Sequence, residues 1–148
     1  MVSMLHQYFQ ISHWFGPLEL HFAAAMAWAI VLGYLIGAER ELRGKDAGIS
    51  THILVIIGAT VFTLAGSFDI TGPTRIAANV VTGIGFLGAG LIFHIEGGVK
   101  NLTTASSLWV AAALGVALGF GLYAIAVVAS ILTALIPRIP KIRRKANQ

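Results

Sequence analysis

The chain has 148 residues and is 57% hydrophobic but only 11% charged, whereas soluble domains have about 25% charged residues. This composition excludes an ordinary soluble protein and predicts an all-α integral membrane protein with a single membrane domain. The formal charge of +4 comes from cations beside apolar stretches, which favours a role in membrane topology over nucleic-acid binding. Cysteine is absent, which excludes thiolate metal sites and cysteine nucleophiles.

The sequence divides into three parts. Residues 1–17 mix aromatic side chains with histidines and contain no Lys or Arg, so we predict an interfacial segment at the lipid headgroups rather than a cleaved signal peptide. Residues 18–137 are predicted to form the transmembrane domain, and residues 138–148 a basic cytoplasmic tail that is attracted to anionic lipids.

The first membrane span is predicted from Leu20 to Ala38, where no residue is charged. Gly33 and Gly37 are four residues apart and give this helix a small-residue face for packing on another helix. Residues 39–46 are rich in charge and are predicted to form a polar loop.

Glu39, Arg40 and Glu41 follow directly after the first span. The two carboxylates could coordinate a cation or contact a partner, because hard divalent cations prefer oxygen ligands. The alternative, which we favour, is a solvated helix end whose charged side chains extend to the headgroups.

The second span is predicted within residues 47–68, with Ser50 or Thr51 capping the start of its helix. Residues 69–75 contain Gly72-Pro73 and are predicted to form a turn. Thr74, near the end of this turn, is predicted to cap the third span.

The third span is predicted from Ile76 to Ile95, a stretch with no formal charge that is long enough to cross a bilayer core of about 30 Å. Glycines leave much of its surface open to close approach by other helices, so we predict a glycine-rich central helix. These glycines are Gly83, Gly85, Gly88 and Gly90. Gly83 to Gly88 also match a dinucleotide-binding pattern, but the strand and acidic residue that this pattern requires are missing, so no cofactor is predicted.

The last two spans are predicted as a hairpin. Residues 96–101 form a second loop, and the uncharged stretch from Asn101 to Pro137 would be about 55 Å long as one helix, so it must fold back. Gly119-Phe120-Gly121 is the predicted turn, which leaves spans at about residues 104–119 and 122–136.

Five spans place every Lys and Arg except Arg75 on one side of the membrane. By the positive-inside rule, that side and the C-terminus are cytoplasmic, and the N-terminus is outside.

Polar residues near the spans are the candidate functional residues. Arg75 and Asn79 are four residues apart and share a helix face, and Asn79 either lines a polar cavity or, as we favour, bonds to a neighbouring helix. Thr103 and Thr104 can cap the fourth span. His52 and His94 lie on the same side, but no carboxylate spacing completes a metal site, so metal ligands stay unassigned. The candidate polar cluster is Glu39, Arg40, Glu41, Thr51, His52, Arg75, Asn79, Thr103 and Thr104.

Several stretches occur in order over about residues 33 to 123: GYLIGAERE at 33–41, Ala47-Gly48 before Thr51-His52, RIAA at 75–78 leading into VTGIGFLGAG at 81–90, and LTTA at 102–105 with Trp109. Together they resemble the membrane domain of the MgtC/SapB family. This chain has Ser50 where the family usually has Arg, and Asn101 where it usually has Gly. The resemblance implies a multi-pass bacterial inner-membrane protein of about five spans, in a short form without the C-terminal ACT-like domain of longer members.

The resemblance also links the chain to virulence, growth in low magnesium and inhibition of ATP synthase, and the family is often labelled as a magnesium transporter. The carboxylates of this chain lie at span ends, whereas a transporter needs ionisable groups at mid-membrane depth. We therefore expect a regulator of magnesium homeostasis, ion homeostasis or membrane energetics that contacts other membrane proteins, such as ATP synthase, or forms a homo-oligomer. The alternative is a transporter or channel for Mg²⁺ or another cation that uses Glu39, Glu41 and Asn79. No catalytic signature is present, so we do not expect an enzyme.

Overall fold

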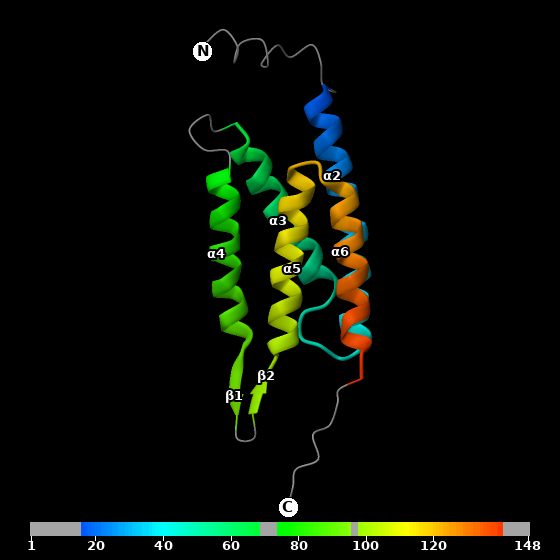
Figure 1. The fold of residues 1–148 in the computed structure, drawn as a ribbon, viewed down its shortest axis with the longest axis vertical. Helices are drawn as coiled ribbons and strands as arrows, with labels where there is room; N and C mark the ends of the chain where they lie inside the picture. Colours follow the sequence, from blue (N-terminus) through cyan, green and yellow to red (C-terminus); the bar gives the residue numbers. More distant parts are fainter. Residues whose placement is uncertain (1–15, 69–73, 96–97, 141–148) are drawn as a thin grey trace, which may run out of the picture.

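The computed structural model describes residues 16–68, 74–95 and 98–140, and in these ranges the chain forms a bundle of apolar helices that run alternately up and down (Figure 1). The helices are α2 (Pro17–Leu42), α3 (Ile49–Gly66), α4 (Thr74–Leu91), α5 (Leu102–Gly119) and α6 (Tyr123–Leu135), which continues into a 3₁₀ turn, η1 (Ile136–Arg138). The first four are long and apolar enough to cross a membrane, and α6 is a shorter apolar helix. The predicted all-α membrane fold is confirmed.

Helix α2 is longer than the predicted first span. Pro17 lies in its first turn, where the missing N–H costs nothing, and the helix continues through the charged residues to Leu42. Glu, Arg and Leu favour the helical conformation, and the helix stops before Gly44, whose φ of +62° is left-handed. The predicted loop at 39–46 therefore begins only after Leu42.

Helices α2 and α3 pack closely through two glycines. A Cβ atom on Gly33 would lie 2.7 Å from the Cα of Ile53, and one on Gly37 would overlap the backbone of Ile49. Glycine is thus required for the observed distance between these helices.

Helix α5 lies at the centre of the bundle and contacts α2, α3, α4 and α6. Of its apolar stretch, 56% is buried, against 11% for α4. Close packing on α3 depends on small residues of α5 itself, because a Cβ on Gly115 would overlap the backbone of Ile56 and one on Gly119 would lie 2.6 Å from the Cβ of Thr63. The core residues of α5 and of the helices around it are Ala25, Ala29, Leu32, Ile36, Ile56, Ala111, Leu114, Leu118 and Ala126.

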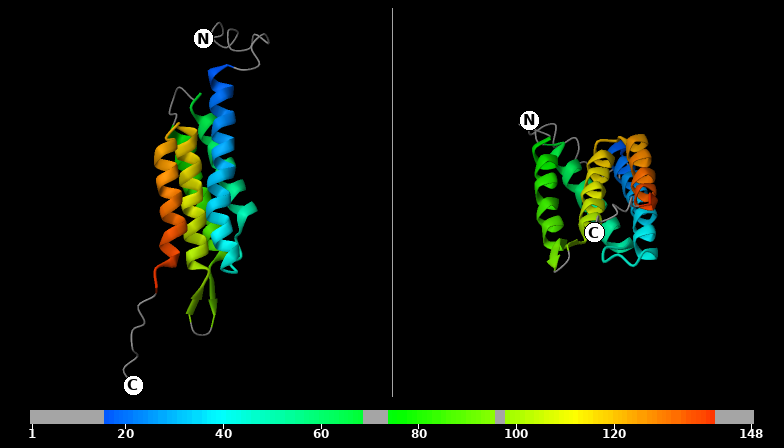
Figure 2. Two further views of the ribbon diagram at one scale, coloured as in Figure 1. Left: turned by 90° about the vertical axis from the view of Figure 1, so that its right-hand side faces the viewer. Right: turned by 60° about the horizontal axis from the view of Figure 1, so that its bottom comes forward.

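The structure corrects the prediction that the glycine-rich helix is central. That helix is α4, which lies at the edge of the bundle against α3 and α5 (Figures 1 and 2). A Cβ atom at Gly83, Gly85 or Gly90 would meet nothing within 4 Å, and one at Gly88 would make ordinary contact with Ala105 at 3.8 Å. The physical reason is that the small faces of α2 and α5 already fill the interior around α3.

A short hairpin replaces the predicted end of the third span. Helix α4 ends at Leu91, and β1 (Phe93–Ile95) pairs antiparallel with β2 (Gly98–Lys100), with Phe93 opposite Lys100. Aromatic and β-branched side chains favour a strand here, and Gly98 adopts a φ of +144°. Within the predicted loop at 96–101, residues 98–100 are strand, and residues 96–97 lie outside the described ranges.

The hairpin of the last two helices is confirmed. Helix α5 ends at Gly119, Gly121 has a left-handed φ of +75°, and α6 begins at Tyr123. The backbone N–H of Leu122 donates to the carbonyl of Ala117 at 2.8 Å, which closes the turn.

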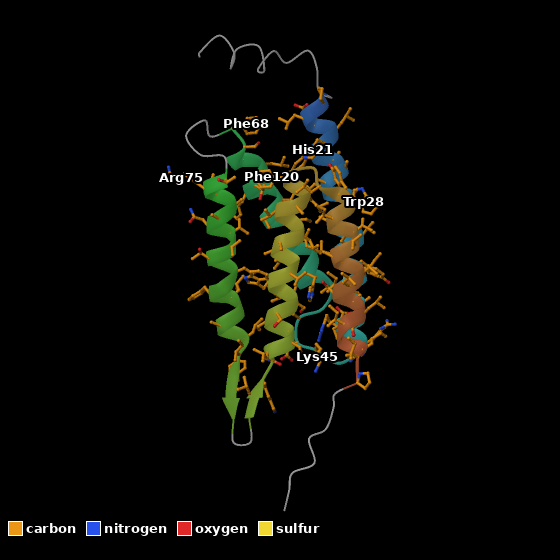
Figure 3. All side chains as sticks on the ribbon, viewed as in Figure 1. His21, Trp28, Lys45, Phe68, Arg75 and Phe120 are labelled. Atoms are coloured by element: carbon orange, nitrogen blue, oxygen red, sulfur yellow. The ribbon has the colours of Figure 1, made fainter. Side chains whose placement is uncertain are left out.

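The bundle has two chemically different ends. We call the end that holds the 43–48 loop, the β hairpin and η1 the basic end, and the other the Arg75 end. Figure 3 shows Lys45 at the basic end and Arg75 together with His21, Phe68 and Phe120 at the other. Most of the predicted interfacial segment 1–17 and of the basic tail 138–148 lies outside the described residues.

Candidate functional site

Glu39 and Arg40 lie in the last turns of α2, and both are buried, with 5% and 1% of their surfaces exposed. The interpretation that we favoured from the sequence, a solvated helix end, is therefore wrong for these two residues. They are buried because the glycine contacts with α3 bring that helix against this end of α2.

The Glu39 carboxylate contacts two arginines. Its Oε2 lies 3.7 Å from Arg40 Nε, and its Oε1 is paired with Arg43, one helical turn later. The Arg43 side chain is 40% exposed. Neither Glu39 oxygen nor Arg40 Nε has a hydrogen-bond partner with good geometry among the described residues. Such buried charges are costly unless they are paired, so this cluster depends on mutual ion pairing.

Glu41 has a different role from Glu39. The backbone N–H of Ile49 donates to Glu41 Oε1 at 2.9 Å. Gly48 is the N-cap of α3 and has no side chain to bond the free amides. Glu41 therefore caps α3 from across the loop, a role that we predicted for Ser50 or Thr51.

His52 connects α3 to α5 inside the basic end. Its side chain is fully buried, Nδ1 lies 2.7 Å from the Gly48 carbonyl oxygen and Nε2 lies 3.1 Å from Ser107 Oγ. A carbonyl only accepts hydrogen bonds, so Nδ1 must be the protonated donor. Both ring nitrogens are thus engaged within the protein.

Thr104 and Ser107 lie one turn apart at the start of α5. Ser107 Oγ lies 2.8 Å from the Thr104 carbonyl oxygen, and its single proton is donated either to this carbonyl or to His52 Nε2. Thr104 is fully buried, and its Oγ1 has no partner among the described residues. The predicted cap at Thr103 or Thr104 is not formed, because both lie inside the helix, where Asn101 is the N-cap with a left-handed φ of 63°.

Asn101 also ties two loops together at the basic end. Its Nδ2 donates to Asp46 Oδ2 at 2.7 Å, so the loop after α2 is joined to the start of α5. Asn101 is one of the two positions at which the chain departs from the pattern of the family that it resembles.

The structure separates the nine candidate residues into two groups. Seven lie at the basic end, on α2, α3 and α5, although Glu41, Thr51 and Thr103 are exposed there. Arg75 and Asn79 are exposed on α4 towards the opposite end. They do not join the buried cluster, which we define as Glu39, Arg40, His52, Thr104 and Ser107.

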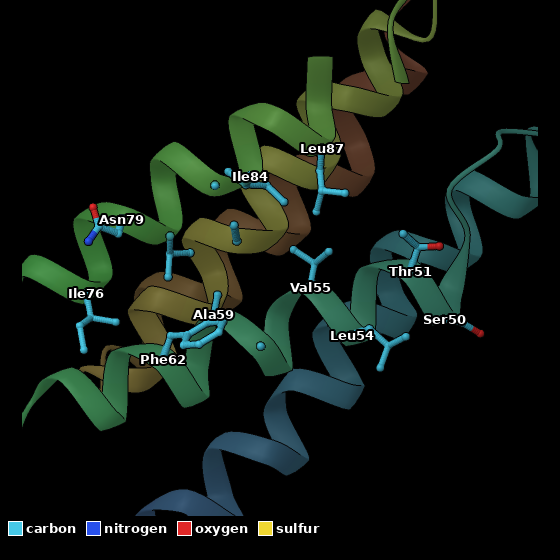
Figure 4. Close-up of a pocket in the computed structure, with 14 residues that line it drawn as sticks. Ser50, Thr51, Leu54, Val55, Ala59, Phe62, Ile76, Asn79, Ile84 and Leu87 are labelled. Carbon is cyan, nitrogen blue, oxygen red and sulfur yellow. The ribbon is translucent and has the colours of Figure 1, made fainter. Parts of the chain in front are cut away.

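An apolar groove of about 640 Å³ lies between α3 and α4. Figure 4 shows Asn79 near one end of this groove and Ser50 and Thr51 near the other. Most of the lining between them is apolar, and Gly58 and Gly83 also line it.

Sequence reasoning missed several polar contacts between distant residues. The His52–Ser107 contact and the Asp46–Asn101 bond each join residues that are 55 positions apart, and no local pattern signals them. Another contact joins α2 to α6, where Tyr123 Oη lies 2.8 Å from His21 Nδ1.

The described residues include no group of three or more His, Asp or Glu side chains that could hold a metal ion. His94 lies in β1, at the same end of the bundle as His52, but its side chain lies outside the described part of the structure, so a metal site shared by the two histidines is not tested.

Comparison with known proteins identifies relatives over most of the chain. A model of the MgtC family matches residues 26–144. The chain is 48% identical to Protein MgtC of Brucella abortus over 113 residues, which cover 75% of this chain and 48% of that protein. It is 45% identical to Protein MgtC of Salmonella typhimurium (strain LT2) over 117 residues, which cover 78% of this chain and 49% of that protein.

A third relative has a name that mentions transport. The chain is 42% identical over 111 residues to the Escherichia coli K12 protein named "Putative magnesium transporter YhiD". The match covers 68% of this chain and 52% of that protein. The chain thus spans about half the length of these curated relatives. No solved structure matches it.

Proposed function

Because the chain belongs to the MgtC family, we propose that it is a bacterial inner-membrane protein that acts in magnesium homeostasis or membrane energetics by contacting other membrane proteins. Its membership of this family and its several apolar helices make it a multi-pass membrane protein. The name of one relative, "Putative magnesium transporter YhiD", mentions magnesium. ATP synthase is the partner that the family resemblance suggests.

The observation that carries this proposal is where the charged groups lie. In the spans, Asp, Glu, Lys and Arg occur only in the first or last turns, at Glu19, Arg75 and residues 39–41. A cation path across a bilayer needs ionisable or carbonyl groups at mid-membrane depth. Here the groove between α3 and α4 is lined mostly by apolar side chains, which suits contact with lipid or protein better than passage of an ion.

The proposed orientation places the basic end in the cytoplasm. Cations gather there, and the positive-inside rule assigns such loops to the cytoplasmic side. The N-terminus is then outside and the C-terminus inside. The cations of this end among the described residues are Arg40, Arg43, Lys45, Lys100 and Arg138.

A second candidate is a cation transporter, favoured by the buried Glu39 carboxylate with its unpartnered oxygens. Two features weigh against it. Arg40 and Arg43 already neutralise Glu39. Asn79 lies near the start of α4, towards the Arg75 end, whereas Glu41 lies in the last turn of α2, at the basic end.

The experiment that separates the two candidates combines flux and growth. Purified protein would be placed in sealed proteoliposomes with a magnesium-sensitive dye inside. In parallel, the gene would be expressed in a bacterium that lacks its own MgtC-family protein, and growth would be followed at low magnesium. Glu39→Gln is the test variant, and Glu19→Gln, at the opposite end of α2, is its matched control.

We expect growth to be restored by the wild-type chain and by Glu19→Gln, with no magnesium flux above that of empty vesicles. Saturable flux that Glu39→Gln abolishes, while the variant still inserts and folds, would refute the regulator and establish the transporter. Failure to restore growth without flux would refute both candidates.

A further inference from the structure

Helix α4 exposes an unusual seam to the surroundings of the bundle. Its buried residues are Ala77 and Ile84, and Ile84 packs with Ala59 of α3 and Leu108 of α5. Beside these buried residues, others recur at alternating spacings of three and four, the heptad pattern along which two helices pack. These residues are Ile76, Asn79, Gly83, Phe86 and Gly90, and the first three also line the groove between α3 and α4.

Bulky side chains and gaps alternate along this seam. Phe86 is 83% exposed, the largest fraction among the exposed large hydrophobic residues of α4. Gly83 and Gly90 lie on either side of it, and a Cβ atom at either glycine would meet nothing within 4 Å. The seam therefore offers a projecting ring between two hollows, a shape that a second helix can fill.

Asn79 is the polar member of the seam, and its side chain is exposed. It makes no side-chain hydrogen bond to another described residue, whereas Thr82 on the same helix can donate to the Ala78 carbonyl of its own helix, at 3.5 Å. Lipid tails supply no hydrogen-bonding groups, so an amide in a span needs a protein partner. A lipid in the groove would leave Asn79 unsatisfied.

A second copy of the chain fits this requirement. Two copies inserted in the same orientation can be related only by an axis along the membrane normal, so each residue meets its own counterpart at equal depth. An amide is both donor and acceptor, so Asn79 of one copy can bond to Asn79 of the other. The facing glycines allow the backbones to approach closely.

We propose that two copies of this chain form a parallel dimer along the α4 seam, with the Asn79 amides bonded to each other across the two-fold axis. Arg75 is one turn from Asn79 and lies in the first turn of α4. Its long side chain can extend to the headgroups and keep the two cations apart. The dimer forms whether or not the chain also contacts other membrane proteins.

The absence of cysteine makes a direct test possible in native membranes. Gly83→Cys places a thiol on the seam, and Gly85→Cys is its matched control. Both glycines are open in the single chain, but they are about 200° apart around the helix. Oxidation should convert Gly83→Cys into a disulfide-linked dimer of two 15.6 kDa chains, because facing cysteines come within bonding distance.

The Gly85→Cys variant should remain monomeric. Equal crosslinking of both variants, or of neither, would overturn the dimer. A crosslinked product of another mass would also overturn it and would assign the seam to a different protein.

The amide contact is tested separately. Energy transfer between labelled chains monitors the dissociation of the dimer in detergent. Asn79→Ala should weaken the dimer roughly 3- to 30-fold, the range expected for an interhelical hydrogen bond in a membrane. Thr82→Ala should leave it unchanged. An unchanged Asn79→Ala dimer would refute the amide pair.

Discussion

His52 Nε2 lies 3.1 Å from Ser107 Oγ, in a fully buried contact between α3 and α5. The two residues are 55 positions apart, and the other ring nitrogen bonds the Gly48 carbonyl. This contact fixes the start of α3 against the central helix. It lies at the same end of the bundle as the buried pair Glu39 and Arg40.

Removal of the Ser107 hydroxyl should destabilise the protein. Ser107→Ala leaves His52 Nε2 without a partner in a buried site, which costs about 1–3 kcal/mol. The measurement is unfolding in mixed micelles of mild detergent and SDS. Ser106→Ala is the control, because Ser106 is exposed and, among the described residues, its hydroxyl bonds only the Leu102 carbonyl of its own helix. Equal loss of stability in both variants would show that the contact with His52 contributes nothing.

Two glycine substitutions should have opposite outcomes. A methyl group on Gly37 would overlap the backbone of Ile49, so Gly37→Ala must push α3 away and should cost about 1–3 kcal/mol or more. A methyl group on Gly58 would meet nothing within 4 Å, and alanine favours the helix by about 1 kcal/mol. Gly58→Ala should therefore be neutral or stabilising in the same unfolding assay. A tolerated Gly37→Ala would contradict the close packing of α2 and α3.

The cap supplied by Glu41 predicts a local effect. Glu41→Ala should remove the acceptor for the Ile49 amide and loosen the first turn of α3, at a cost of about 0.5–2 kcal/mol. Hydrogen exchange at the Ile49 amide should speed up by about 2- to 30-fold. Glu41→Gln keeps an acceptor oxygen and should exchange close to the wild-type rate. If Ser50→Ala had the larger effect, the cap would belong to Ser50 instead.

The sequence predicted the helices well because each depends on a local pattern. Long uncharged stretches and the Gly119 to Gly121 turn are enough to place α5 and α6. The arrangement around the centre was not predictable in this way. Gly115 and Gly83 look alike in the sequence, but Gly115 packs on α3 while Gly83 is open. Which glycine is buried depends on contacts between distant helices.

The buried site was only partly predictable for the same reason. The charged run at Glu39 to Glu41 marked a candidate, but its burial depends on Gly37, which lets α3 lie against it. Ser107 carried no signal, because a serine in an apolar span usually bonds its own helix. Its contact with His52 follows from the packing of α5.

Because Glu39 and Arg40 form a buried pair, we predict that a protein with only one of the two charges is less stable than a protein with neither. Glu39→Gln leaves Arg40 buried without its counter-ion and should cost about 3–5 kcal/mol, whereas apolar replacement of both residues is often neutral. The double variant Glu39→Leu with Arg40→Met should therefore recover most of the stability lost in Glu39→Gln. Mixed-micelle unfolding of the single and double variants measures the difference. Arg43, which is partly exposed, stays in both proteins and cannot account for the recovery. A double variant less stable than Glu39→Gln would mean that the charges are held by contacts other than their own pairing.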